Sequence, residues 1–274
     1  MSEDKKPTQQ YAIGYGEIVQ MFSRRTAATH AAYLLPHLRS GMTLLDIGCG
    51  PGSISVGLAK SVAPGELRGL DIEESQVKKA RAAAAAEGLE NASFDVGDVT
   101  ALAFNDDTFD VVHAHAALEH VKDLTTALRE IKRVLKPGGI LAARDLICDS
   151  CFVEPDIGGD MAGMWQVFIS RLVASGGHPQ IGKQYRGILS DAGFGDIEAS
   201  ASFDYYGSTA AVEFLHQSRI ANFFAPAAVE ADIARGVATR EQFDEWRQLW
   251  DQWVTTPGAF GAYARGEVLA RKPS

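Results

Sequence analysis

The sequence has few cysteines and no long run of apolar residues. Three cysteines among 274 residues, unevenly placed, are too few for a disulfide framework. No apolar stretch reaches the roughly 20 residues that a membrane-spanning helix needs. The N-terminus, MSEDKKPTQQ, lacks the apolar centre of a secretory signal. Together these absences predict a cytoplasmic protein without a membrane span.

An excess of positive charge is also missing. Lysine and arginine number 26 against 35 aspartates and glutamates, which gives a formal net charge of -9. An acidic chain has no general attraction for phosphate backbones. Basic clusters such as Lys78 and Lys79 have the spacing of an outer helix face. The composition therefore predicts no nucleic-acid partner. It neither supports nor excludes an oligomer.

Cys148 and Cys151 have the CxxC spacing of some redox and zinc sites. A single pair, without a second pair or a nearby histidine cluster, is a weak signal for either function. We therefore expect two small apolar side chains just past a strand, and no metal site.

From Thr43 onward, short apolar runs bounded by glycine alternate with longer amphipathic stretches. The apolar runs predict strands at Thr43–Ile47, Leu67–Leu70, Ser93–Val96, Phe109–His113 and Ile140–Ala143. Helices are expected between them, at Ser53–Val62, Glu74–Glu87 and Thr125–Leu135. Such alternation predicts βαβ units, so the expected fold class is α/β with a parallel, doubly wound sheet and helices on both faces.

The pattern changes on both sides of this alternation. Residues 11–36 have apolar positions at helical spacing, so residues 1–40 form an expected N-terminal tail with helices. After a core over residues 41–147, we expect the remainder of the same domain at residues 148–274. This part should contain helices at Met161–Ala174 and Lys183–Ala192, a strand at Asp196–Tyr205, a helical cap at about 205–256 and a final strand at Ala262–Ala270.

The stretch LLDIGCGPG, from Leu44 to Gly52, ends a buried strand and opens a helix. Asp46 lies at the end of the strand, and glycines follow at 48, 50 and 52. Glycine permits positive φ and lets a ligand lie against the main chain. The turn falls at the carboxyl end of the first strand, where open α/β sheets bind ligands. Its third glycine comes one position earlier than in the dinucleotide fingerprint GxGxxG, so the loop does not match a pyrophosphate-binding loop. An NAD-dependent oxidoreductase is therefore the less favoured, alternative interpretation.

Further acidic residues end the next two strands. Asp71, in ELRGLDIEES, can accept hydrogen bonds from both hydroxyls of a ribose, and the neighbouring Ile72 can pack on a purine. Asp98, in DVGDVTALAF, can accept from the exocyclic amine of adenine while the Val99 amide donates to the ring. Either aspartate alone is more often a turn residue or a helix cap. In this order, at successive strand ends, the signals predict an adenosine-containing ligand.

These motifs, continued by VGDVTALAFNDDTFDVVHAHAALEHVKD and REIKRVLKPGGILAARD, resemble the core of class I S-adenosylmethionine-dependent methyltransferases. The chain is most similar to the branch of ubiquinone and menaquinone biosynthesis methyltransferases, over about residues 41–147. The resemblance implies a Rossmann-like, seven-stranded, mostly parallel sheet with an antiparallel last strand. It also implies S-adenosylmethionine as cofactor and S-adenosylhomocysteine as product.

The same resemblance implies where the cofactor binds. The first motif contacts the methionine part, the residue matching Asp71 the ribose, and the residue matching Asp98 the adenine amine. Two further stretches look like those of a broader group of bacterial and fungal methyltransferases: FSRRTAATHAAYLLPHL and GMWQVFISRLVASGG. By that resemblance, Arg25 and Thr26 would reach the cofactor carboxylate. Tyr15, one helical turn from Tyr11, would either close over the cofactor or simply pack. The full expected set is Tyr15, Arg25, Thr26, Asp46, Gly48, Cys49, Gly50, Gly52, Asp71, Ile72, Gly97, Asp98, Val99, His115 and Ala116.

Methyl transfer from a sulfonium is an in-line displacement, so the protein must mainly align the acceptor and exclude water. An oxygen or nitrogen acceptor can also need a general base, and a carbon acceptor can need its enolate stabilised. The candidates are His115 and His120, after the fourth strand, and Asp145, at the end of the fifth. For each, a positioning or purely architectural role is the alternative. A non-catalytic protein that has kept the fold is a further alternative for the whole chain.

The cap is rich in large aromatic side chains. Trp246, Trp250 and Trp253 recur at three- and four-residue spacing, which defines one face of a helix. That face either forms the core of the cap or covers an apolar acceptor. Inserts at the ligand edge commonly carry substrate specificity on a rigid scaffold. We therefore expect a small, apolar or aromatic methyl acceptor whose choice depends on the cap.

Overall fold

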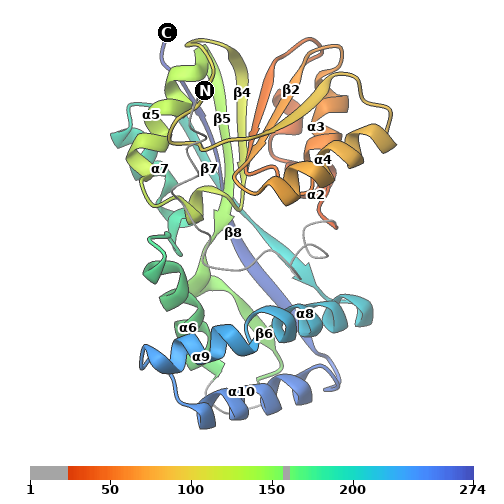
Figure 1. Ribbon diagram of the computed structural model, residues 1–274, viewed down its shortest axis with the longest axis vertical. Helices are drawn as coiled ribbons and strands as arrows, with labels where there is room; N and C mark the ends of the chain where they lie inside the picture. Colours follow the sequence, from red (N-terminus) through yellow and green to blue (C-terminus); the bar gives the residue numbers. More distant parts are fainter. Residues whose placement is uncertain (1–23, 157–160) are drawn as a thin grey trace, which may run out of the picture.

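The computed structural model describes residues 24–156 and 161–274. Its centre is an eight-stranded sheet in the order β3-β2-β1-β4-β5-β8-β6, with β7 also paired to β8 (Figure 1). The strands are β1 Leu44–Ile47, β2 Leu67–Asp71, β3 Ala92–Val96, β4 Phe109–His115, β5 Leu135–Leu146, β6 Phe152–Glu154, β7 Gly195–Tyr206 and β8 Phe260–Arg271.

The direction of the strands confirms the expected sheet. β1, β2, β3, β4 and β5 pair in parallel, whereas β8 runs antiparallel to both β5 and β7. The last strand is therefore the antiparallel one. The short strand β6, half exposed and paired only through three residues of β8, is an addition to the seven strands that the sequence indicated.

Helices cover both faces of the sheet. One face carries α3 (Ser55–Val62) and α4 (Glu74–Ala86), and the other carries α5 (Leu124–Val134) and α7 (Ile181–Asp191). Helix α5 shows why its position could be predicted from the sequence. Asp123 caps its first turn by accepting from the Thr126 amide, and its apolar residues recur every three or four positions and are buried.

The N-terminal region is less helical than expected. Within its described part, α2 (Ala27–His30) has four residues, and a short 3-10 turn at Leu35–His37 follows. Small side chains explain the placement of α2, because a Cβ on Gly57 of α3 would lie 2.6 Å from the Ala27 Cβ. The two helices therefore approach closely at this point. The start of the expected helix, and Tyr15, lie outside the described residues.

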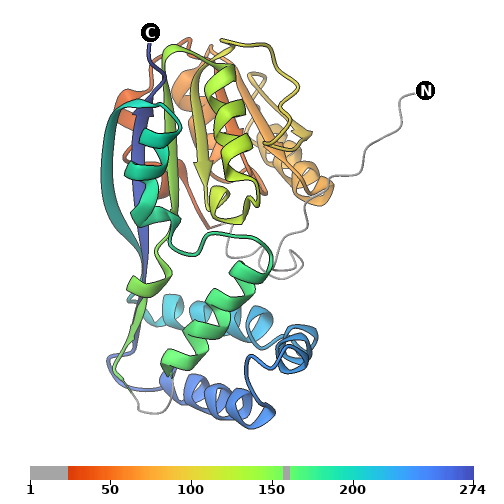
Figure 2. The same cartoon turned by 90° about the vertical axis from the view of Figure 1, so that its left-hand side faces the viewer.

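Four helices form the cap: α6 Met161–Ala174, α8 Thr209–Asn222, α9 Pro226–Ala234 and α10 Arg240–Trp253. Figure 2 shows them gathered beyond the end of the sheet at which β5 ends, joined to it by the long strands β7 and β8. No helix within residues 24–156 and 161–274 has the length and apolar character needed to cross a membrane.

The tryptophans of α10 form the core of the cap. Trp246, Trp250 and Trp253 are at most 1% exposed, and the rings of Trp250 and Trp253 stack with centroids 4.7 Å apart. The Trp253 indole N–H donates to the backbone carbonyl of Glu154, 3.0 Å away. Of the two interpretations of this aromatic face, the structure supports the packed core.

Candidate active site

The loop after β1 is shaped by glycine. Gly48 and Gly52 have φ of +65° and +81°, in the left-handed region that favours glycine. A Cβ on Gly48 would lie 2.6 Å from the Ala117 Cβ, and one on Gly52 would lie 2.9 Å from Ala80 of α4. The loop can therefore pass close to the end of β4 and to α4 only without side chains at these positions. Gly52 serves this packing and does not line the cleft described below.

The carboxylate of Asp71 holds the loop from the neighbouring strand. Its two oxygens accept from the Gly50 amide at 2.9 Å and from the Glu73 amide at 3.0 Å. The side chain is buried, and burial raises its pKa, while these amide hydrogen bonds oppose the rise. Each carboxylate oxygen accepts more than one hydrogen bond, so Asp71 can still bind a diol while it fixes the loop.

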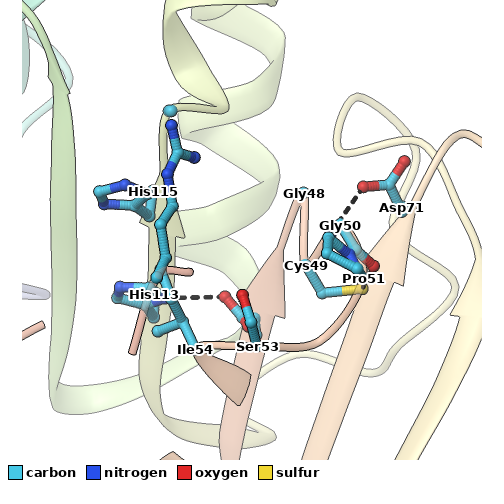
Figure 3. Close-up of a pocket in the computed structure, with 12 residues that line it drawn as sticks. Gly48, Cys49, Gly50, Pro51, Ser53, Ile54, Asp71, His113 and His115 are labelled. Carbon is cyan, nitrogen blue, oxygen red and sulfur yellow. Dashed lines mark hydrogen bonds and ion pairs between the residues drawn. The ribbon is translucent and has the colours of Figure 1, made fainter. Parts of the chain in front are cut away.

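Asp46 ties the start of the loop to the next strand. One oxygen of its buried carboxylate lies 2.7 Å from Nδ1 of His113, and the other accepts from the Ser55 hydroxyl. Figure 3 shows His113 and His115 on one side of the glycine loop, with Asp71 across it. The loop is thus anchored from both neighbouring strands.

Two adjoining cavities lie along this loop and share Gly48 and Asp71. The first is lined by Arg25, Asp46, Gly48, Cys49, Gly50, Pro51, Ser53, Ile54, Asp71, His113, His115 and Ala116. The second is lined by Ile47, Gly48, Leu70, Asp71, Ile72, Gly97, Asp98, Val99, Ala117, His120 and Val121. We call the two together the cleft.

The cleft brings together most of the predicted cofactor residues. Of those that the structure describes, all except Thr26 and Gly52 line one of its cavities, and Tyr15 lies outside the described residues. Thr26 is exposed, and its hydroxyl instead caps α2 by accepting from the Thr29 amide. Arg25 does line the first cavity. Burial and the nearby charge of Arg265 lower its pKa to about 10, so it remains a cation at neutral pH.

His115 is a buried imidazole without a hydrogen-bond partner among the described residues. It is 6% exposed, neither ring nitrogen is bonded, and its edge meets the His30 ring with centroids 5.4 Å apart. Burial and the charges of Arg25 and Arg144 hold its pKa well below the ordinary value. The neighbouring Ala116 has φ of +50°, a strained conformation for a non-glycine residue. A neutral ring with open nitrogens in a cavity is suited to bind a ligand.

The other two predicted catalytic side chains lie elsewhere. His120 lines the second cavity rather than the first and pairs with Glu119 at 3.4 Å. Asp145 is fully buried and lines neither cavity, so the structure does not support its role as a base. Its carboxylate accepts from the Glu119 amide and from the Tyr185 hydroxyl, which ties β5 to α7.

Sequence reasoning missed several lining residues, of which His113 is the most informative. The spacing His113-Ala114-His115 places both histidines on one face of β4, because side chains alternate along a strand. That alternation, together with Asp46 on the adjacent strand, is the signal that would have found it. Ser53 and Ile54 also line the first cavity, but no local motif distinguishes them.

The cysteine pair lies among apolar side chains of the cap. Cys148 and Cys151 are both free thiols, and Cys148 is buried in the core of the cap. Burial raises the pKa of Cys148, and it raises that of Cys151 to about 11. Both thiols therefore stay protonated at neutral pH, as expected for apolar packing residues.

Sequence comparison identifies the family. A family model described as a methyltransferase domain matches residues 38–174, half of the chain. The chain belongs to this methyltransferase family. An uncharacterised methyltransferase of Schizosaccharomyces pombe is 34% identical over 72% of this chain and 74% of its own length. A demethylmenaquinone methyltransferase of Desulfitobacterium hafniense is 31% identical over 68% of this chain and 65% of its own.

Structural comparison agrees with this assignment. A phosphoethanolamine N-methyltransferase of Haemonchus contortus, solved with S-adenosylhomocysteine, is similar with a TM-score of 0.54 and 20% identity, over 86% of this chain and 50% of the other. The methyltransferase is thus of the Rossmann-like class I, and S-adenosylmethionine is its cofactor. The cleft fits that cofactor, because Gly48 and Gly50 line it without a Cβ and both nitrogens of the buried His115 ring lack a partner among the described residues.

Proposed function

We propose that the protein transfers the methyl group of S-adenosylmethionine to a small, apolar or aromatic molecule, and that the cofactor occupies the cleft. Asp71 would hold the ribose where the two cavities meet. Asp98 and Val99 would bind the adenine in the second cavity. The methionine part would extend into the first cavity, toward Arg25 and His115. The single observation that carries this proposal is that both cavities share Gly48 and Asp71.

The adenine end of the cleft has the groups that a purine needs. Asp98 accepts from the Thr100 amide and hydroxyl through one oxygen, at 2.8 and 2.7 Å, which orients the carboxylate. Ile72 and Val99 add apolar surface to the same cavity. A carboxylate beside apolar walls can accept from an amine while the ring packs against the walls.

The bound cofactor supplies a methyl group already activated on a sulfonium. The protein therefore needs to orient the acceptor and exclude water. We propose that His115 acts by hydrogen bonding to the acceptor or cofactor. A base role is less suited to it, because the surrounding arginines oppose the formation of an imidazolium. Of the three predicted catalytic side chains, only His115 lines the first cavity.

We further propose that residues 41–147 bind the cofactor and that the cap governs acceptor choice. Helices α8, α9 and α10 of the cap lie between β7 and β8, so the sheet does not need them to complete the cleft. No residue of α8, α9 or α10 lines either cavity. The net charge of -9 argues against a nucleic-acid acceptor.

Calorimetric titration with S-adenosylhomocysteine and with NAD tests the cofactor assignment. S-adenosylhomocysteine should bind, and NAD should not, because the loop lacks the dinucleotide glycine spacing. Binding of NAD alone would overturn the proposal. Transfer of a labelled methyl group to a panel of small molecules then separates an enzyme from a non-catalytic protein of the same fold.

A further inference from the structure

Two buried arginines in the cap have very different surroundings. Arg171 of α6 and Arg219 of α8 are each 9% exposed. Arg171 pairs with the buried carboxylate of Asp232 at 2.5 Å and donates to the Phe223 carbonyl at 2.9 Å. Arg219 makes no ion pair with any residue that the structure describes. A buried cation is normally matched by an anion, so Arg219 requires an explanation.

Aromatic rings surround the Arg219 guanidinium instead. Its central carbon lies 4.8 Å from the ring centre of Trp165, 5.1 Å from that of Phe168 and 4.9 Å from that of Tyr263. Its Nε donates to the Tyr263 hydroxyl at 2.7 Å. The two Nη groups make no hydrogen bond within the described part of the chain. Rings offset part of the cost of burying the charge, but they leave the planar Nη pair open to a ligand.

A strip of side chains connects Arg219 to the cleft. Tyr263 and Arg265 are two residues apart on β8 and therefore share a face. Two residues along a strand span roughly 7 Å. On β7, Tyr206 packs against Tyr263 with ring centroids 5.4 Å apart. The strip thus runs from the sheet to the cap in one side-chain layer.

Contacts at the sheet end of the strip lead to the first cavity. Nε of Arg265 lies 2.8 Å from the Asp204 carboxylate, and Nε2 of His30 lies 3.7 Å from the same carboxylate. The His30 ring in turn meets the ring of His115, which lines the first cavity, with centroids 5.4 Å apart. A molecule of one or two rings placed along this strip would have one end near the methyl group and the other near Arg219.

We infer that Arg219 binds a carboxylate of the methyl acceptor and thereby determines which small molecules the enzyme accepts. This inference rests on the proposed function. A carboxylate matches the open Nη pair, because a guanidinium binds it through two parallel hydrogen bonds. The rings of Trp165 and Phe168 would pack against the apolar or aromatic part of the same molecule. Arg219 would act as a specificity residue and would not take part in the transfer step.

Calorimetry with two matched probes tests the inference. Benzoate and benzamide, which differ in charge but hardly in shape, are titrated into the full-length protein saturated with S-adenosylhomocysteine. Benzoate should bind at least tenfold more tightly than benzamide. In Arg219→Gln this preference should disappear, while affinity for S-adenosylhomocysteine stays within about twofold of wild type. Arg219→Lys should keep part of the preference, because it retains charge without the planar pair.

Arg171→Gln is the control for damage to the cap. It removes a cation of equal burial and should lower the melting temperature while the preference for benzoate remains. Absent or equal binding of benzoate in wild type would overturn the inference. So would a preference that survives in Arg219→Gln, or one that is lost equally in Arg171→Gln. If Arg219→Gln does not fold, the preference for benzoate over benzamide in wild type and its reduction in Arg219→Lys test the inference instead. Failure to bind S-adenosylhomocysteine would instead contradict the proposed function.

Discussion

The cleft and the cap hold their side chains in place by different means. In the cleft, backbone amides and glycines fix the shape of the loop. Asp71 accepts from the Gly50 amide, and Gly48 leaves room for the segment that follows β4. In the cap, large rings pack against one another, with Trp246 and Trp250 fully enclosed. A site whose shape depends on backbone conformation tolerates few substitutions in its loop. A region built from packed side chains can change its shape through single substitutions of those side chains.

This difference teaches where specificity can vary in this methyltransferase. The cleft must accept one cofactor, and its geometry follows from strand order and loop conformation. In the cap, α6 precedes β7, and α8, α9 and α10 lie between β7 and β8, outside the parallel strands that carry the glycine loop. If the cleft binds the cofactor and the cap governs acceptor choice, as proposed, substitutions in the cap should change the acceptor without disturbing the cofactor. Four measurements separate the two regions.

The largest expected effect is on the stability of the cap. Trp250→Ala should lower the free energy of unfolding by about 3–5 kcal/mol, because it removes a fully buried indole and leaves a cavity. Under conditions in which the variant is folded, its affinity for S-adenosylhomocysteine should change less than threefold. Urea unfolding and calorimetry measure the two effects. Val173→Ala, at a 58% exposed position of α6, is the control and should do little. A parallel loss of cofactor affinity would mean that the regions are not separate.

Asp71→Ala should act on the cleft in the opposite way. Loss of a charge-assisted contact to the ribose typically costs about 1.5–3 kcal/mol, which is roughly a ten- to hundredfold loss of affinity. The variant also frees the Gly50 amide, so the loop should become less ordered. Calorimetry gives the affinity, and thermal unfolding checks that the fold is intact. Unchanged affinity would place the ribose elsewhere.

Asp145 sharpens the comparison, because it is a buried acid of the sheet outside the cleft. Burial and the charge of Glu119 raise its pKa to about 6, so the folded protein binds more protons than the unfolded chain between about pH 4 and 6. Its contribution to stability should be complete below about pH 4 and should fall by on the order of 2–3 kcal/mol as the pH rises through 6. Asp145→Asn should remove this fall and leave S-adenosylhomocysteine binding unchanged. A loss of binding would restore Asp145 to the site.

His115 should show the reverse pH dependence, with the smallest effect. Its pKa is held below the ordinary value, so near pH 6 the unfolded chain binds a proton that the folded protein does not. Stability should therefore fall as the pH drops below about 6.5, by at most about 1.4 kcal/mol per pH unit. In His115→Asn this contribution disappears, which thermal unfolding across pH 5–7 can detect. His37→Asn is the control. An unchanged slope in His115→Asn would contradict a neutral, desolvated ring.

Much of the cleft was predictable because its chemistry is local. The glycine spacing, Asp71 and Asp98 each follow a strand within a few residues, so sequence order alone brought them to one edge of the sheet. Such positions need only the periodicity of strands and helices, and the later helices and strands were also close to their expected bounds.

What remained unpredictable depends on contacts between distant segments. The indole N–H of Trp253 donates to the backbone carbonyl of Glu154, 99 residues away, and no local sequence pattern predicts that hydrogen bond. Asp145 lies near the end of a strand like Asp71, yet its side chain bonds the Glu119 amide and Tyr185 of α7 and does not line the cleft. Thr26 falls beside Arg25 but caps α2. Sequence spacing predicts which residues lie at the ligand-binding edge of the sheet, whereas the direction of each side chain depends on packing between distant segments.

Hydrogen exchange with and without S-adenosylhomocysteine tests the division between cleft and cap most directly. Bound cofactor should slow exchange of the backbone amides at residues 48–50, 71–73 and 97–100, which line the cleft or donate hydrogen bonds to its carboxylates. Exchange in the cap helices α8, α9 and α10 should stay the same. Protection centred on the cap, with none at the glycine loop, would contradict the account.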